Sequence, residues 1–258
     1  FTVAECSRFV EAAQAAEQRG QVVRVFENFL FYPPVMRLVK LVREGEIGEV
    51  LSVRQFSRSG NPDCGWDVPD RAAAWRFDIE QNGGGPLVFD DGLHKFSIFW
   101  ALLGVADEVP AWLGSTPVEG GALDSRSAVT MRWGSGAMGV LEVVIAPELQ
   151  VQSLFYSQDD RVEVTGSKGV AWVNRGHGKI QELPSLQVYR DGTTRDFEDI
   201  ASEWDESFIL ATRDFIEAVR EGRSSLLTAD EHRQVLSTAL AAQVSGREDR
   251  VVRPVDVP

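Results

Sequence analysis

The chain has 258 residues, of which 43% are hydrophobic and 25% charged, and 26 basic against 39 acidic side chains give it a formal charge of −13. This composition is typical of a globular protein, and the acidic balance argues against nucleic acid or an anionic membrane as a partner. The longest strictly apolar run, 98–103, is far shorter than the roughly 20 residues of a membrane-spanning helix. Because Cys6 and Cys64 are too few for a disulfide scaffold, we expect a reduced, cytoplasmic protein.

The first part of the chain predicts helices interrupted by loops and short strands. Thr2 and Glu5 have the spacing of a capping box, so a helix is expected to begin there and to end near Gly20. The elements expected next are a buried strand at 22–26, a helix at 34–44, a strand at 49–58, loops at 59–70 and 83–85, and an apolar helix at 91–103.

The second part changes to the two-residue period of strands. Thr228 and Glu231 form another capping box ahead of the last helix. The expected elements are strands at 128–133, 138–146, 161–165, 170–174 and 186–190, followed by helices at 203–220 and 229–243. Hairpins grouped between helices predict an α+β fold, with a mostly antiparallel, open-faced sheet covered by helices on one face.

Two glycine motifs resemble nucleotide-binding sequences but have the wrong context. Residues 134–139 read G-x-G-x-x-G, yet a strand pattern follows where a dinucleotide site needs a helix, so we interpret them as a hairpin turn. Residues 166–169 lack the spacing of a phosphate-binding loop and are expected to form a turn as well. The three histidines, His94, His177 and His232, are far apart, and no metal site is predicted.

The strongest candidate for chemistry lies where the loop 83–85 leads into the apolar helix. Asp90 and His94 are four residues apart, a spacing that puts two side chains on one helix face. A carboxylate beside an imidazole can fix its tautomer, and the pair could then take a proton from an alcohol. The alternative is structural: Asp90 or Asp91 caps the helix and His94 is a partly buried packing residue.

The arrangement of these motifs resembles the Gfo/Idh/MocA family of NAD(P)-dependent sugar dehydrogenases, which includes glucose-fructose oxidoreductase and inositol dehydrogenase. The resemblance rests on a glycine loop followed by D-x-G-x-H at 90–94 and on the closing Leu-Leu-Gly at 102–104. Supporting segments are G-E-I-G-E-V at 45–50, Trp75-Arg76, E-V-T-G-S-K-G at 163–169, and the stretch from Phe215 to Val252.

Members of this family place a Rossmann domain of about 120 residues and a Glu-Lys-Pro motif before the helix with which this chain opens. The resemblance therefore implies that residues 1–31 are a remnant helix and last strand of that domain. Residues 32–258 would form the C-terminal substrate-binding and oligomerisation domain. The lysine of the motif joins the family's Asp and His in the active site and has no counterpart here, so we expect this chain alone to be inactive.

The resemblance implies an enzyme that moves hydride between a hydroxyl carbon of a sugar or cyclitol and NAD or NADP. His94 would be the acid/base, Asp90 would orient it or hold a substrate hydroxyl, and Trp75 and Arg76 would line the substrate pocket. It also implies a homo-oligomer formed through the helix-free sheet face, with an apolar surface supplied by Val140, Val144, Trp133 and Trp172. Two alternatives remain open: an NAD-dependent glycosidase of the same family, and a non-catalytic domain for assembly or regulation.

Overall fold

The computed structural model describes residues 2–257 apart from 62–64, 66–68, 70, 72–73, 119–120, 175–179 and 225. Cys64 and His177 lie outside the described residues. The helices are α1 (Val3–Glu17), α2 (Pro33–Arg43), α4 (Ile79–Asn82), α5 (Gly92–Leu103), α6 (Asp205–Glu221) and α7 (Ala229–Glu248). The strands are β1 (Val50–Ser59), β2 (Ala111–Trp112), β3 (Thr116–Val118), β4 (Gly121–Leu123), β5 (Ser127–Arg132), β6 (Met138–Ile145), β7 (Gln158–Gly166), β8 (Gly169–Val173), β9 (Leu186–Arg190) and β10 (Thr193–Phe197).

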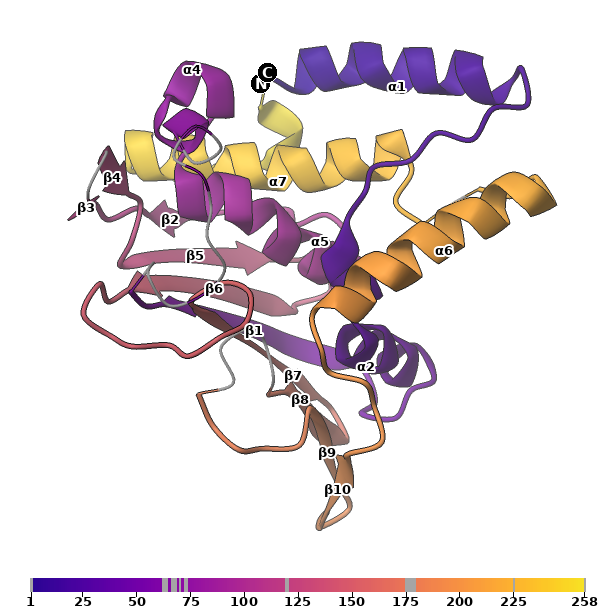
Figure 1. Cartoon of the computed structure of the whole chain (residues 1–258), viewed down its shortest axis with the longest axis vertical. Coiled ribbons are helices and arrows are strands. Elements are labelled where there is room, and N and C mark those ends of the chain that lie inside the picture. The colour runs from indigo at the N-terminus through magenta and orange to yellow at the C-terminus, as the bar shows by residue number, and fades with distance from the viewer. Residues whose placement is uncertain are drawn as a thin grey trace.

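Eight strands form the main sheet, in the order β10-β9-β8-β7-β1-β6-β5-β2, and β3 pairs with β4 separately (Figure 1). Neighbouring strands of the main sheet run antiparallel except β1 and β6, which are parallel. β1 lies between β6 and β7, with Val53 opposite both Gly139 and Val164. The predicted α+β fold with a mostly antiparallel sheet is therefore confirmed.

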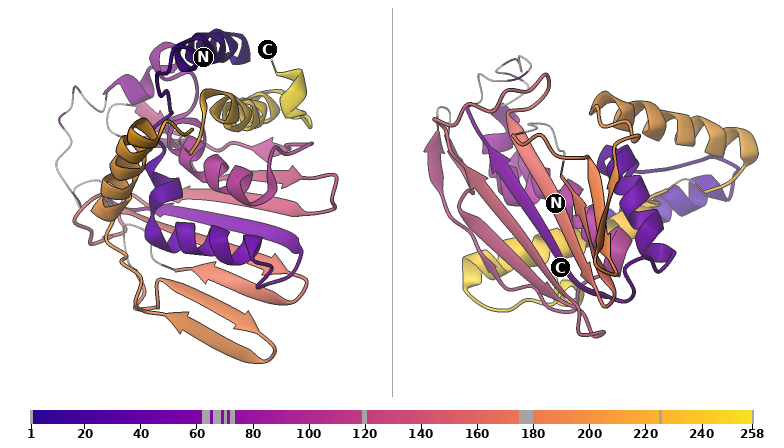
Figure 2. Two further views of the ribbon diagram at one scale, coloured as in Figure 1. Left: turned by 90° about the vertical axis from the view of Figure 1, so that its right-hand side faces the viewer. Right: turned by 90° about the horizontal axis from the view of Figure 1, so that it is seen from below.

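The helices lie on one face of the sheet, and the two further views show this face and the sheet edge-on (Figure 2). α2 packs against β8 and α5, α5 packs against β1 and α7, and α1 packs along α7. Strand residues alternate between this core and the open face, so Val53, Gln55 and Ser57 of β1 are buried while Arg54, Phe56 and Arg58 are not. Trp133 also points to the core, where its ring stacks on Phe99 and its Nε1 donates to the carbonyl of Gly104.

Most predicted helices and strands are present, and both capping boxes are formed. The strand expected at 22–26 is wrong: residues 21–27 form no ladder with any described strand, and the amide of Val25 donates to the carbonyl of Leu227 in the loop before α7. A strand needs a neighbour to satisfy its backbone, and no described strand is placed to pair with this one. The pattern also missed β10 and the 3₁₀-helix Asn28–Phe31.

The G-x-G-x-x-G sequence forms the predicted hairpin turn between β5 and β6. Trp133 and Ala137 pair across it, and Gly136 has a φ of 89°, which favours glycine. Lys168 and Gly169 likewise lie at the tight connection from β7 to β8. Neither glycine motif is placed at the start of a helix, so neither can present helix amides to a phosphate.

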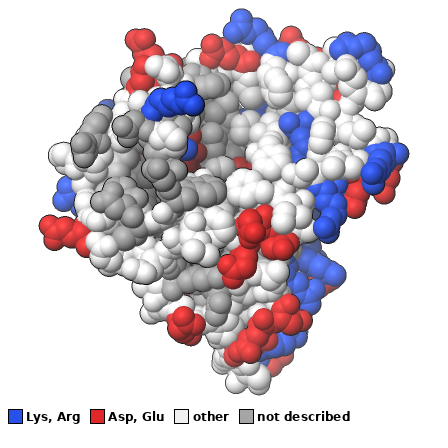
Figure 3. Space-filling view, in the orientation of Figure 1, with Lys and Arg blue, Asp and Glu red and all other residues white. Residues whose placement is uncertain are grey.

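The surface carries charges of both signs, and none of the described helices is both long and apolar enough for a membrane. On the face seen in Figure 3, basic side chains lie among acidic and uncharged ones. No described helix combines the length and the apolar character needed to cross a bilayer.

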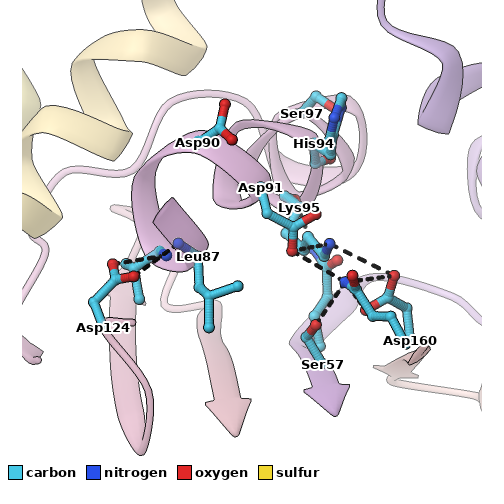
Figure 4. A network of polar contacts seen from close by, with 12 residues as sticks. Ser57, Leu87, Asp90, Asp91, His94, Lys95, Ser97, Asp124 and Asp160 are labelled. Carbon is cyan, nitrogen blue, oxygen red and sulfur yellow. Dashed lines mark hydrogen bonds and ion pairs between the residues drawn. The ribbon is translucent and has the colours of Figure 1, made fainter. Parts of the chain in front are cut away.

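Lys95 ties helix α5 to the sheet. Its side chain is 3% exposed, and its Nζ lies 2.6 Å from Oδ2 of Asp91 and 3.5 Å from Oδ2 of Asp160 on β7 (Figure 4). Gln158 donates to both carboxylates and to the hydroxyl of Ser57, and Gln55 donates to the carbonyl of Lys95. Burial lowers the pKa of Lys95, but the two carboxylates raise it more strongly, so the ammonium form is retained.

Replacing Thr228 with alanine removes the hydroxyl that caps α7 at the amide of Glu231, and we expect the free energy of unfolding to fall by about 1 kcal/mol. Urea denaturation followed by circular dichroism measures the change. Thr212 is exposed within α6, so Thr212→Ala is the control and should leave stability unchanged or slightly higher. An equal loss in both variants would contradict the capping role.

Lys95→Met keeps the length of the side chain but leaves Asp91 and Asp160 facing one another without their cation. We expect a loss of about 3–5 kcal/mol at pH 7, because breaking a buried ion pair strands its partners. Adding Asp160→Asn removes one of these charges and should recover part of the loss in the same denaturation experiment. A loss under about 1 kcal/mol from Lys95→Met would show that the cation does not hold the helix.

Candidate active site

The junction between the glycine loop and α5 is shaped by close packing. Residues Pro86–Asp91 wind as a π-helix that leads directly into α5. Asp124 accepts hydrogen bonds from the amides of Leu87 (2.7 Å) and Val88 (2.9 Å). A Cβ on Gly85 would lie within 2.0 Å of the Asp124 carboxylate, and one on Gly84 within 2.4 Å of the Phe89 ring. These glycines therefore let the acceptor and the ring approach the start of the helix.

His94 is held by a carboxylate that the sequence analysis did not identify. Its Nδ1 lies 2.8 and 2.9 Å from the two carboxylate oxygens of Glu27, whose side chain is 5% exposed. The ring stacks on Phe29 with centroids 4.2 Å apart and planes 8° from parallel. Burial lowers the pKa of His94. The charge and hydrogen bond of Glu27 raise it by more than burial lowers it, so the pKa lies above its ordinary value of 6.5.

Asp90 does not fill the role of orienting His94. Its Oδ2 accepts a hydrogen bond of 2.9 Å from Nε of Arg76, and Figure 4 shows it apart from the cluster of Asp91, Lys95 and Asp160. The i, i+4 spacing suggested a contact between Asp90 and His94, but the π-helix ends at Asp91 and changes the winding between the two residues. Asp90 borders the same pocket as His94, so the alternative role, holding a substrate hydroxyl, stays a prediction.

The pocket at this junction has a volume of about 290 Å³. Polar groups on its wall include Asp90, Asp91, His94, Arg76 and Tyr156, and burial raises the pKa of Tyr156. Aromatic rings of Phe29, Phe77, Trp204 and Phe208 complete much of the described wall. Hydrogen-bonding groups thus face apolar surfaces across a small space, an arrangement suited to a compact polar molecule.

Of the predicted substrate-binding pair, Arg76 lines the pocket and Trp75 does not belong to its described wall. The guanidinium of Arg76 lies 5.1 Å from the centre of the Trp75 ring, so the two side chains are in cation–π contact. Tyr156 and Glu27 carry no motif. Glu27 lies 67 residues before His94 and follows a stretch of β-branched residues. Nothing in this local pattern predicts that the carboxylate contacts a helix so far along the chain.

His232, on the first turn of α7, lies near Glu27 and His94. Burial lowers its pKa, with Glu27 opposing that change and His94 adding to it. Within the part of the chain that the structure describes, no group of three or more His, Cys, Asp or Glu residues is arranged to hold a metal ion. A larger hollow of about 700 Å³ lies on the open sheet face, where Arg54 pairs with Glu142 and Trp172 pairs with Glu163. None of the described residues on its wall is a histidine.

Comparisons with known proteins agree with the fold. Residues 39–257 match the model of the GFO_IDH_MocA oxidoreductase family, C-terminal alpha/beta domain. The chain is 24% identical over 240 residues to the uncharacterized oxidoreductase YrbE of Bacillus subtilis, covering 91% of this chain and 64% of that protein. It is 25% identical over 263 residues to myo-inositol 2-dehydrogenase of Thermotoga maritima, covering 100% and 71%.

Solved structures with the same fold include an oxidoreductase from Agrobacterium radiobacter in complex with NAD+, L-tartaric acid and magnesium. It has a TM-score of 0.79 and 16% identity and covers 98% of this chain and 70% of its own. Levoglucosan dehydrogenase in complex with NADH and levoglucosan gives 0.75 and 20%, with the same coverage. The chain thus spans about two thirds of the length of its relatives, and it belongs to the Gfo/Idh/MocA oxidoreductase family, matching its C-terminal alpha/beta domain.

Proposed function

We propose that this chain is the substrate-binding part of an NAD(P)-dependent oxidoreductase that acts on a hydroxyl carbon of a sugar or cyclitol. The observation that carries the proposal is a histidine with one ring nitrogen held by a carboxylate, set in a pocket that also contains Asp90, Asp91 and Arg76. Myo-inositol and levoglucosan, which the names of two relatives mention, are compact molecules rich in hydroxyl groups.

The residues of the pocket divide the work of binding and proton transfer. A substrate hydroxyl donates to Nε2 of His94, which takes the proton as the carbinol carbon loses hydride. Asp90 and Asp91 accept hydrogen bonds from neighbouring hydroxyls, and Arg76 donates to a substrate oxygen while it neutralises Asp90. Phe29 and Trp204 cover the C–H surfaces of the ring and exclude water.

The described residues do not form a cradle for a dinucleotide, since the one G-x-G-x-x-G sequence is a hairpin between β5 and β6. A nicotinamide would supply the hydride acceptor. We place its binding in a Rossmann domain preceding this chain, with residues 1–31 as the remnant and 32–258 as the substrate domain. The match of residues 39–257 to the family's C-terminal domain and the greater length of the relatives support this division. The preference for NAD or NADP belongs to that domain.

His94→Ala in the full-length protein removes the proton acceptor, and we expect kcat for polyol oxidation to fall by roughly 10²- to 10⁴-fold. NADH or NADPH absorbance measures the rate, and near-UV circular dichroism checks the fold. The matched control is Ser135→Ala in the hairpin turn, an exposed position outside the described wall of the pocket, which should retain full activity.

Two outcomes would replace the proposal. Release of free sugar from a glycoside without net NADH would indicate the NAD-dependent glycosidase instead. Unchanged activity in His94→Ala would indicate that this domain serves assembly or regulation.

We propose further that two copies associate through the open face of the sheet. Helices cover the other face, while Val140, Val144, Phe56 and Trp172 are only partly exposed on this one and stand among ion pairs such as Arg54 with Glu142. The expected apolar patch is smaller than predicted, because Trp133 points into the core.

Val140→Lys adds a charge beside Arg54, its neighbour on β1, and a contact between copies would then bury like charges. Light scattering after size-exclusion chromatography should show a shift from dimer to monomer at micromolar concentration. The control is Val219→Lys on α6, an equally simple change at a 54% exposed site, which should leave the mass unchanged. An unchanged mass in both variants would remove the sheet face as the interface.

A further inference from the structure

We propose that Glu27 is the positioning residue of the site: it fixes the tautomer and the ring orientation of His94. This inference rests on the proposed role of His94 as proton acceptor. It assigns a residue outside the segment 39–257 that matches the family model, and it replaces the Asp90–His94 pairing that the sequence suggested.

The carboxylate of Glu27 is itself fixed in place. The amide of Phe29 donates to its Oε1 at 3.0 Å, and both oxygens lie within 2.9 Å of Nδ1 of His94. Since the side chain is almost completely buried, water competes little for these contacts. Stacking on Phe29 holds the imidazole in one plane, so its orientation is set from two sides.

The contact decides which ring nitrogen carries the proton. A carboxylate only accepts hydrogen bonds, so neutral His94 must place its hydrogen on Nδ1. The lone pair is then on Nε2, the nitrogen for which the described residues offer no hydrogen-bond partner and which can serve a ligand in the pocket. When His94 takes up a proton at Nε2, the negative charge of Glu27 stabilises the imidazolium that forms.

Other charged groups near His94 cannot replace Glu27. Asp91 raises the pKa of His94 less than Glu27 does. Asp91 is also paired with Lys95, whose positive charge lowers the pKa of His94. His232 is partly buried and this burial lowers its pKa, so it adds little positive charge. Asp90 bonds Arg76.

The segment that carries Glu27 is anchored to α6. Arg24, with a side chain 4% exposed, donates to the carbonyl of Ala211 at 2.7 Å and pairs with Asp214 on α6. Asn28 donates to the hydroxyl of Ser207 at 2.9 Å. These contacts lie on each side of Glu27 and hold its backbone against α6. The geometry of the contact between Glu27 and His94 therefore depends on how the chain before α2 packs on α6.

The test is nitrogen-15 NMR of the histidine rings in the 258-residue chain, with His94 assigned by the signal lost in His94→Ala. We expect neutral wild-type His94 to show the Nδ1–H tautomer and a pKa above 6.5. In Glu27→Gln, burial is no longer opposed by the charge, so the pKa should fall by at least about one unit. Asp90→Asn is the matched control and should change it by less than about 0.3 units.

The wild-type spectrum alone can overturn the inference: an Nε2–H tautomer or a pKa below 6.5 would do so even if Glu27→Gln fails to fold. A larger pKa change in Asp90→Asn than in Glu27→Gln would restore the Asp90 pairing. In the full-length protein, Glu27→Gln should move the acidic limb of the kcat profile to lower pH. If His94→Ala leaves turnover intact, the proposed function fails while the NMR result stands independently.

Discussion

A lysine ammonium group is costly to remove from water, and Lys95 is buried with the carboxylates of Asp91 and Asp160 as its partners. Asp91 lies at the start of α5 and Asp160 on β7, so the three charges fix how the helix is rotated over the sheet. His94 precedes Lys95 by one residue and therefore points about 100° away around the helix axis. The placement of the imidazole in the pocket follows from where the helix must direct its lysine.

The fold followed from local patterns wherever hydrophobic period, caps and turns agreed. The capping boxes at Thr2 and Thr228, the hairpin at 134–136 and the apolar helix ahead of Gly104 depend on interactions within a few residues, and the structure contains them all. Residues 22–26 show the limit of this reasoning. β-branched residues favour an extended backbone, but a strand also requires a partner, which no local pattern supplies.

The sequence indicated where the candidate pocket lies, but not which side chains contact one another in it. The glycine loop and the D-x-G-x-H sequence marked the junction at which Arg76, Asp90 and His94 border one pocket. Helical spacing then assigned Asp90 to His94, because it assumes 3.6 residues per turn, whereas the π-helix breaks that count. Glu27 could not be found this way: only the folded chain brings it across 67 residues, and no periodicity links an extended segment to a helix.

The position of β1 bears on the order in which the chain folds. β5 with β6, and β7 through β10, are hairpins that can form from neighbouring segments, but β6 and β7 do not pair with each other, because β1 lies between them. β1 must therefore enter from a distant part of the chain, and the entropy of closing those loops is lost before its ladders stabilise the sheet. The two locally formed groups of strands are thus joined only when β1, which is synthesised before them, pairs with both β6 and β7. A chain with β1 unpaired would expose the edges of β6 and β7.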